Sequence, residues 1–270
     1  MLLCILICLM TCHAQGYSSG EDSSEEWASQ TEAYEPKKRI VGGAGAKEGE
    51  IPYQVSLRTA EDGSYFCSGS IIYTQWILTV AHCLQNRKPS EFKIIAGTIK
   101  LNEGGIKYDV NSIFLHENFN TTSFQNDIAL IKTTAPIKYM HPNIQSIPLA
   151  TKETPAGAYC TVSGWGYLNN RAYLTSNHLQ KIEVKIVSLE TCKKVFRPWN
   201  DIRPFTKSQI CTYKDNGKGI SHGDSGDPLV LDNEVVGISS LAISSNHGIP
   251  DIFTKVYAYR KWVKDIVDAN

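Results

Sequence analysis

Long hydrophobic runs are almost missing from this chain. The one long run is the N-terminal MLLCILICLMTC, and its twelve residues are too few for a bilayer span, which takes about 20. There is no dense basic segment, and 27 Lys and Arg balance 27 Asp and Glu. Such a chain has no electrostatic footprint for nucleic acid. With 20 Gly, 11 Pro and 42% hydrophobic residues, the composition is that of a globular protein, and we expect no nucleic-acid or membrane partner.

Metal-binding spacings of cysteine and histidine are also absent, so we expect no metal and no cofactor. Of the eight cysteines, Cys4, Cys8 and Cys12 lie in the N-terminal apolar run, which leaves five in the rest of the chain. An odd number predicts at least one thiol that is free or pairs between chains.

The first 39 residues predict a targeting segment followed by a flexible one. Residues 1–16 have the short apolar region and small residues of a secretory signal peptide. Residues 17–39 are acidic and Ser-rich, with six acidic residues over the whole N-terminal stretch against three basic ones, and they end in Lys37, Lys38 and Arg39. Such a segment cannot bury enough apolar surface to fold, and its basic end is an exposed cleavage site. We therefore expect a secreted, extracellular protein with a propeptide.

From residue 40 onward the patterning is mostly that of short strands. Residues 54–58 alternate polar and apolar side chains, as in a half-buried strand, and residues 92–97, 127–131 and 235–238 are β-branched runs between turn residues. A short helix is predicted around 189–196, with Ser188 as N-cap. Apolar residues at helical spacing predict a second helix at the C-terminal end. The Pro-rich stretch 135–155 is the candidate connection between two β-rich halves.

Three motifs carry the chemistry: WILTVAHC (residues 76–83), NDIAL (126–130) and GDSGDPL (223–229). Each has a simpler structural interpretation alone. In the order His, Asp, Ser, together with IVGG at 40–43 and SGWG at 163–166, they resemble the chymotrypsin/trypsin family of serine endopeptidases, from residue 40 to the end. The resemblance implies an all-β fold of two six-stranded antiparallel barrels with a C-terminal α-helix. The implied boundaries are about 40–145 for the first barrel, 146–255 for the second and 256–268 for the helix.

By this resemblance, Ser225 is the nucleophile, His82 the general acid and base, and Asp127 the residue that orients His82. The backbone N–H groups of Gly223 and Ser225 would form the oxyanion hole.

Activation follows from the same resemblance. Cleavage after Arg39 would free the amine of Ile40, which would pair with the buried carboxylate of Asp224. The expected partners are a protein or peptide substrate, an activating protease and protein inhibitors.

The resemblance also assigns the remaining cysteines. It implies the disulfides Cys67–Cys83 and Cys192–Cys211, each worth about 3 kcal/mol, and leaves Cys160 as a free thiol. Separately, Asn120 begins an N-glycosylation sequon in a polar stretch.

The chain departs from the family at several positions. Asp227 and Ser68 replace glycines, and Ser221 replaces a cysteine that staples the pocket wall. The base of the specificity pocket is Gly219, whereas Asp251 stands on the far wall. Six pocket residues are expected to contact substrate: Gly219, Ile220, His222, Ser240, Ala242 and Asp251.

Asp251 has two interpretations: it binds a basic substrate side chain, or it is satisfied by backbone donors and only shapes the pocket. The P1 preference stays open and leans toward a broad or chymotrypsin-like one. The expected function is that of a secreted serine endopeptidase made as a zymogen. The alternative is a weak or inactive homologue that binds or regulates other proteins, and Asp227 keeps that alternative open.

Overall fold

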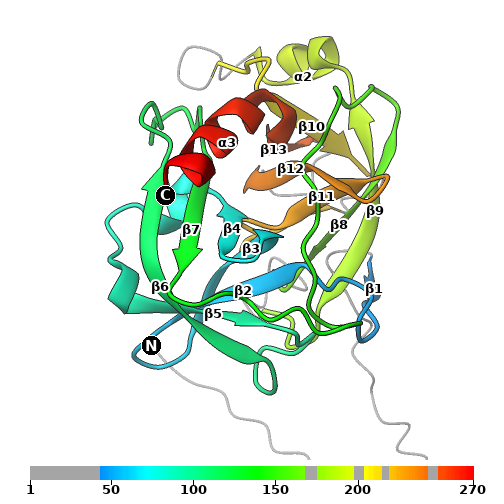
Figure 1. Cartoon of the computed structure of the whole chain (residues 1–270). Coiled ribbons are helices and arrows are strands. Elements are labelled where there is room, and N and C mark those ends of the chain that lie inside the picture. The colour runs from blue at the N-terminus through cyan, green and yellow to red at the C-terminus, as the bar shows by residue number, and fades with distance from the viewer. Residues whose placement is uncertain (1–42, 168–174, 198–203, 215–218, 243–248) are drawn as a thin grey trace, which may run out of the picture. The chain divides into compact units, whose positions relative to one another are not determined.

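Two antiparallel β-barrels make up the described part of the chain (Figure 1). The computed structural model describes residues 43–167, 175–197, 204–214, 219–242 and 249–270. The expected signal peptide, the propeptide, Arg39 and Ile40 lie outside these residues. The prediction of an all-β chymotrypsin-like fold is confirmed.

The first barrel is closed, with strand order β2-β3-β4-β7-β6-β5. Its strands are β2 (Gln54–Thr59), β3 (Tyr65–Tyr73), β4 (Trp76–Thr79), β5 (Phe92–Ala96), β6 (Ile106–Leu115) and β7 (Ala129–Thr133). Apolar residues from all six fill its interior, and Ile71, Ile77 and Ile94 are fully buried there. Burial of such side chains is worth about 2 kcal/mol each, so this core is the main support of the barrel.

The second barrel closes through the pairing of β8 with β9. Its strands are β8 (Tyr159–Gly164), β9 (Gln180–Val187), β10 (Gln209–Tyr213), β11 (Pro228–Leu231), β12 (Glu234–Leu241) and β13 (Asp251–Lys255), and the short β1 (Ala44–Gly45) adds to β9. In β9 the apolar Ile182, Val184 and Ile186 point inward, and the charged residues between them face out. Residues 134–158 connect the two barrels, which spans the predicted 135–155 (Figure 1).

The sequence prediction for β2 was wrong in one respect. The alternation suggested that its polar side chains face solvent, but Gln54 is 3% exposed and Ser56 is fully buried. Gln54 is buried because its amide Nε2 donates to Ser163 O of the second barrel, at 2.8 Å. A buried polar group is tolerated when it is hydrogen-bonded, so alternation alone cannot separate this residue from a surface one.

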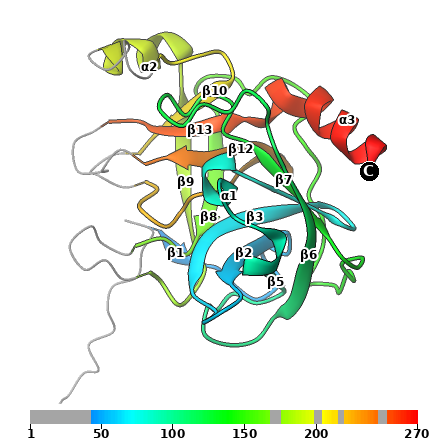
Figure 2. The same ribbon diagram turned by 90° about the vertical axis from the view of Figure 1, so that its left-hand side faces the viewer.

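Helices are few and short in the part of the chain that the structure describes. They are α1 (Ala81–Leu84), α2 (Leu189–Val195) and α3 (Arg260–Ala269), with 3-10 turns η1 (Pro89–Glu91) and η4 (Val256–Tyr259). The predicted N-cap is confirmed, since Ser188 Oγ accepts from Thr191 N at 3.0 Å. The C-terminal helix packs Val263 into the core of the first barrel, and the carbonyl of Asn270, the residue after the helix, accepts a hydrogen bond from Lys132 of β7. Figure 2 shows α3 running to the C-terminal end of the chain. Across the described residues, none of the helices has the length and apolarity needed to span a membrane.

Candidate active site

His82 and Asp127 meet at one end of the first barrel. His82 lies in α1, directly after β4, and Asp127 lies two residues before β7, which pairs with β4. His82 Nδ1 is 2.7 Å from Asp127 Oδ2, and the backbone N–H of His82 donates to Asp127 Oδ1 at 2.9 Å. A carboxylate only accepts, so the ring proton sits on Nδ1 and Nε2 keeps its lone pair.

The second barrel completes the surroundings of Asp127, which is fully buried. Ser240 Oγ of β12 donates to Asp127 Oδ2 at 2.6 Å, and Thr254 Oγ1 of β13 donates to the backbone carbonyl of Asp127 at 2.7 Å. Ser240, which the sequence analysis expects to contact substrate, directs its hydroxyl to Asp127. The sequence carried one signal for this arrangement, a pair of serines inside an otherwise apolar strand.

Ser225 lies in the turn that precedes β11, and this turn is held against the first barrel. The carbonyl of Ser225 accepts from Ser68 N of β3 at 2.8 Å, and Gly226 N donates to Ser239 O at 2.9 Å. Gly226 has φ +86°, and a Cβ there would stand 2.1 Å from Ser68 O. Only glycine allows so close an approach. The turn therefore docks beside Cys67, which is bonded to the neighbour of His82.

Disulfides join Cys67 to Cys83 and Cys192 to Cys211. The Sγ of Cys83 lies 3.8 Å from His82 Nε2, and these atoms together with Cys67 Sγ form a compact group. Both sulfurs belong to the disulfide and are not thiolates, so the group does not have the ligands of a metal site.

The oxyanion turn has a partner that the sequence did not indicate. Gly223 has φ +92°, and its carbonyl accepts from the hydroxyl of Tyr65 at 2.6 Å. The same hydroxyl lies 2.9 Å from Ser68 Oγ. A hydroxyl network on β3 thus fixes the carbonyl of Gly223, which lies in the chain between the two N–H groups that would face an oxyanion.

Asp224 is fully buried and accepts backbone hydrogen bonds from Gly166 at 2.8 Å and Ser221 at 2.7 Å. Burial raises the pKa of Asp224, although these bonds oppose the shift. Asp227 is also fully buried, beside Asp224, and burial followed by the charge of Asp224 raises the pKa of Asp227 well above its usual range. The chain therefore has two acidic side chains below the oxyanion turn.

At the expected pocket base, Asp251 takes the space that a side chain at position 219 would occupy. A Cβ on Gly219 would stand 2.3 Å from Asp251 Oδ2. That oxygen accepts from Ile220 N at 3.1 Å, whereas Oδ1 has no hydrogen-bond partner among the described residues. Burial raises the pKa of Asp251 well above its usual range. The hydrogen-bonded Oδ2 fits the interpretation in which backbone donors satisfy Asp251. The unpartnered Oδ1 fits the interpretation in which Asp251 binds a basic substrate side chain.

The other predicted pocket residues are placed differently from one another. The side chain of Ile220 packs in the core of the second barrel, Ala242 lies half-buried at its edge, and His222 is exposed beside Tyr167. Ser221, in the place of the missing cysteine, donates from Oγ to the carbonyl of Tyr167 at 2.9 Å. The hydroxyl of Ser221 thus links the segment before the nucleophile turn to the segment that ends at Tyr167.

Cys160 is a buried free thiol in β8, and burial raises its pKa to about 12. Asn120 is exposed, and its Oδ1 accepts from Thr122 N and Ser123 N within one turn. The thiol of Cys160 is therefore unsuited to thiolate chemistry. The side chain of Asn120 lies on the surface, as a glycosylation site requires.

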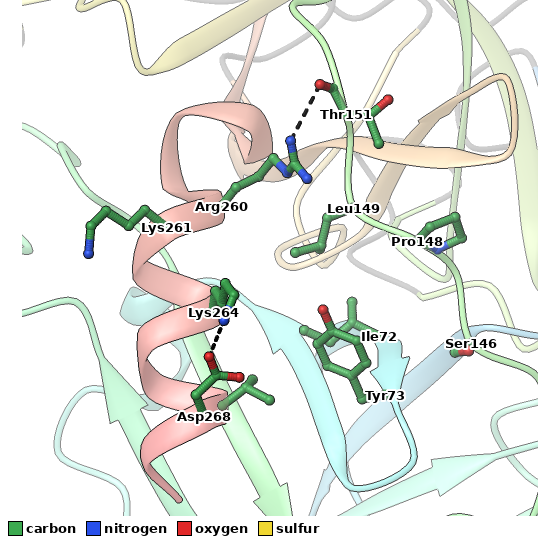
Figure 3. Close-up of a pocket in the computed structure, with 11 residues that line it drawn as sticks. Ile72, Tyr73, Ser146, Pro148, Leu149, Thr151, Arg260, Lys261, Lys264 and Asp268 are labelled. Carbon is green, nitrogen blue, oxygen red and sulfur yellow. Dashed lines mark hydrogen bonds and ion pairs between the residues drawn. The ribbon is translucent and has the colours of Figure 1, made fainter.

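A separate hollow of about 790 Å³ is lined by α3, the end of β3 and residues of the segment 146–151, and Figure 3 shows these lining residues. Its basic groups already have partners: Lys264 pairs with Asp268, and Arg260 donates to the carbonyl of Thr151 at 3.4 Å. Because these charges are satisfied within the chain, the hollow is not a second candidate for the chemistry.

Comparison with known proteins agrees with this geometry. The family model described as Trypsin matches residues 40–263. Chymotrypsin-2 of Vespa crabro is 37% identical over 229 residues, covering 83% of this chain and 98% of that protein. Trypsin theta of Drosophila melanogaster is 36% identical over 241 residues, covering 87% and 88%. The crystal structure of a scabies mite inactivated protease paralogue, S-D1, has a TM-score of 0.78 at 25% identity, over 85% of this chain and 97% of the other. The match of residues 40–263 and these relatives show that the chain belongs to the trypsin family of serine proteases.

Proposed function

We propose that this protein is a secreted serine endopeptidase that hydrolyses peptide bonds with Ser225, His82 and Asp127. The observation that carries the proposal is the buried carboxylate of Asp127, which accepts two hydrogen bonds from His82 and one from Ser240. Such a carboxylate holds the imidazole in one tautomer and stabilises it when it takes up a proton.

The reaction then follows from the proton on Nδ1. His82 Nε2 takes the proton of Ser225 Oγ as this oxygen attacks the scissile carbonyl, and later returns it to the leaving amine. The N–H groups of Gly223 and Ser225 receive the developing oxyanion, and loss of one such donor costs about 3 kcal/mol of transition-state stabilisation. Departure of the amine leaves the acyl group on Ser225 Oγ. Water then attacks this acyl-enzyme while His82 takes a proton from the water, and His82 returns the proton to Ser225 Oγ as the acid product leaves. The proposed reaction uses no metal and no cofactor.

Maturation is part of the proposal. A signal peptide directs secretion, and an activating protease cleaves after Arg39 so that the amine of Ile40 can pair with Asp224. The burial of Asp224, with backbone donors but without a cation among its described partners, supports this pairing. Protein inhibitors are expected to act on the mature form.

The proposed P1 preference is broad, and Asp251 decides whether a basic side chain is admitted. The unpartnered Oδ1 supports this role, since a substrate ammonium or guanidinium would supply the missing donor. A buried carboxyl holds its proton at acidic pH, so basic residues are accepted only as Asp251 ionises. The names of the relatives include both trypsin and chymotrypsin and do not decide the preference.

The nucleophile is tested with a fluorophosphonate probe on protein cleaved after Arg39. We expect labelling at Ser225, none in S225A, and a large loss in H82A because the hydroxyl is no longer activated. Folded, cleaved wild type that takes no label and hydrolyses no peptide or ester would contradict the proposal.

That negative outcome would favour the second candidate function, a non-catalytic homologue that binds other proteins. Two observations support it: Asp227 below the oxyanion turn, and structural similarity to a protein described as an inactivated protease paralogue.

The specificity proposal is tested by the ratio of kcat/KM for Arg P1 substrates to kcat/KM for Phe P1 substrates. In the wild type we expect this ratio to rise with pH, because ionised Asp251 attracts the cation. In D251N it should be lower and independent of pH. An equal pH dependence in both proteins would show that Asp251 does not interact with P1.

A further inference from the structure

Asp227 is an acidic residue in a place with no solvent. It follows the expected nucleophile, Ser225, by two residues and is fully buried. Gln54, from the other barrel, donates from Nε2 to Asp227 Oδ1 at 2.8 Å. The second oxygen, Oδ2, has no hydrogen-bond donor among the described residues.

The Oδ2 oxygen of Asp227 faces Asp224. A Cβ placed on Gly164 would stand 1.6 Å from Asp227 Oδ2 and 2.6 Å from Asp224 Oδ1, so both carboxyl groups crowd around one point. The two distances sum to 4.2 Å, so Asp227 Oδ2 and Asp224 Oδ1 lie no farther apart than that, and a hydrogen bond between the two carboxyl groups is the favourable contact open to them. Two ionised carboxylates cannot make that bond, since each only accepts, and a buried pair of like charges is strongly unfavourable.

One proton on the pair removes both difficulties, and the surroundings indicate which residue carries it. Asp224 already accepts from the backbone N–H groups of Gly166 and Ser221, and such bonds favour an ionised carboxylate. Asp227 has only the neutral amide of Gln54 on one oxygen and needs a donor on the other. The proton therefore resides on Asp227.

The other titratable groups facing the pair from the described elements do not change this assignment. Tyr65 of β3 and Asp251 of β13 both interact with Asp224, and neither is a cation at neutral pH. The guanidinium of Arg58 lies near Tyr65 and donates to the carbonyls of Lys100 and Leu101 instead.

We propose that Asp227 is a protonated positioning residue whose carboxyl group donates a hydrogen bond to the carboxylate of Asp224 and so holds the oxyanion turn. The hydroxyl of Tyr65, which lies 2.9 Å from Ser68 Oγ, holds the same turn at the carbonyl of Gly223. The pair carries one negative charge, which a single ammonium neutralises. This last point rests on the proposed activation, whereas the shared proton does not.

Infrared spectroscopy tests the proton without relying on activity. At pH 7 exposed carboxyl groups are ionised, so a carboxylic C=O band that shifts in D₂O reports a buried protonated acid. We expect such a band in the wild-type secreted chain and its loss in D227N. D251N is the matched control, because it removes a different buried carboxyl group and leaves the Asp227 band. A spectrum of D227N in which every carboxylic band persists would overturn the proposal. If D227N does not fold, the spectrum of D251N tests the proposal instead, and the absence of any carboxylic band from that spectrum would also overturn it.

The pH dependence of unfolding gives a second readout. A carboxyl in the unfolded chain loses its proton near pH 4, whereas folded Asp227 keeps it, so the wild type should lose stability relative to D227N as pH rises above about 4. Below that pH the difference should be constant. A difference independent of pH throughout would mean that Asp227 has only a structural role.

Activity then separates positioning from simple packing. In the cleaved enzyme, D227N retains a donor toward Asp224 and an acceptor for Gln54, so kcat/KM should stay near the wild-type value. D227L lacks both, and kcat/KM should fall about tenfold, as expected on losing a hydrogen bond to a charged group. Equal losses in the two variants would contradict positioning. An inactive wild type with an intact Asp227 band would contradict only the proposed function.

Discussion

Asp127 receives hydroxyl hydrogen bonds at two different atoms, which allows their roles to be separated. Ser240 donates to the carboxylate, and Thr254 donates to the backbone carbonyl. The first bond acts on the group that orients His82, whereas the second acts on the chain that carries it.

We expect S240A to lower kcat/KM about tenfold, because Asp127 loses a hydrogen bond to its charge. T254V is the matched control and should cost stability with a smaller effect on kcat/KM. Steady-state kinetics and thermal unfolding of the two cleaved variants check this, and the opposite ranking would count against the assigned role of Ser240.

The thiol of Cys160 gives a second prediction for a single residue. With its pKa at about 12, native Cys160 should react with iodoacetamide at pH 8 about a thousandfold more slowly than a free cysteine. Alkylation followed by mass spectrometry checks this, with unfolded protein as the positive control and C160S as the blank. Rapid alkylation of the native chain would show that the thiol is accessible.

The turn before β11 requires a glycine at position 226. Gly226 has a left-handed backbone and lies against Ser68 O. Gly157 has a similar φ, +88°, but a Cβ there would contact nothing within 4 Å. Alanine substitutions at Gly226 and Gly157 therefore separate the cost of a left-handed backbone from the cost of a steric clash.

We expect G157A to cost about 1 kcal/mol of unfolding free energy, from the left-handed backbone alone. G226A adds the clash and should cost about 3 kcal/mol or more, with loss of activity as the turn leaves β3. Chemical denaturation and probe labelling measure the two effects. Equal costs would mean that the close approach to Ser68 is relieved without moving the turn.

The elements also show how far patterns predict structure. Helical spacing predicted the C-terminal helix, and the capping preference of serine predicted the start of α2, because both depend on neighbours in the chain. The burial of Gln54 was missed because its partners, Ser163 and Asp227, are more than 100 residues away.

At the scale of the whole molecule, activity is proposed to depend on a cut far from the triad in sequence. R39Q should leave the chain uncleaved and lower activity about 100-fold or more, the loss expected when an oxyanion donor is missing. R39K, which keeps a basic residue at the site, should still be processed by a protease that accepts Lys. N-terminal sequencing and probe labelling check both, and full activity of uncut R39Q would refute activation by cleavage.

Residues of both barrels form the candidate active site, and the sequence alone identified the residues expected to carry the chemistry. The motifs around His82, Asp127 and Ser225 identified the family and its two-barrel fold, since residue type and order are properties of the chain. The family pattern places glycine at position 227, so the resemblance gave Asp227 no role, and it left two interpretations open for Asp251.

Only the tertiary structure decided the surroundings of those residues. It directs Ser240 to Asp127, sets Asp251 against Gly219 and brings the carboxyl groups of Asp227 and Asp224 together beside Gly164. Hydrogen bonding and the protonation of a buried acid depend on distances between segments far apart in the chain, and no local pattern encodes such distances.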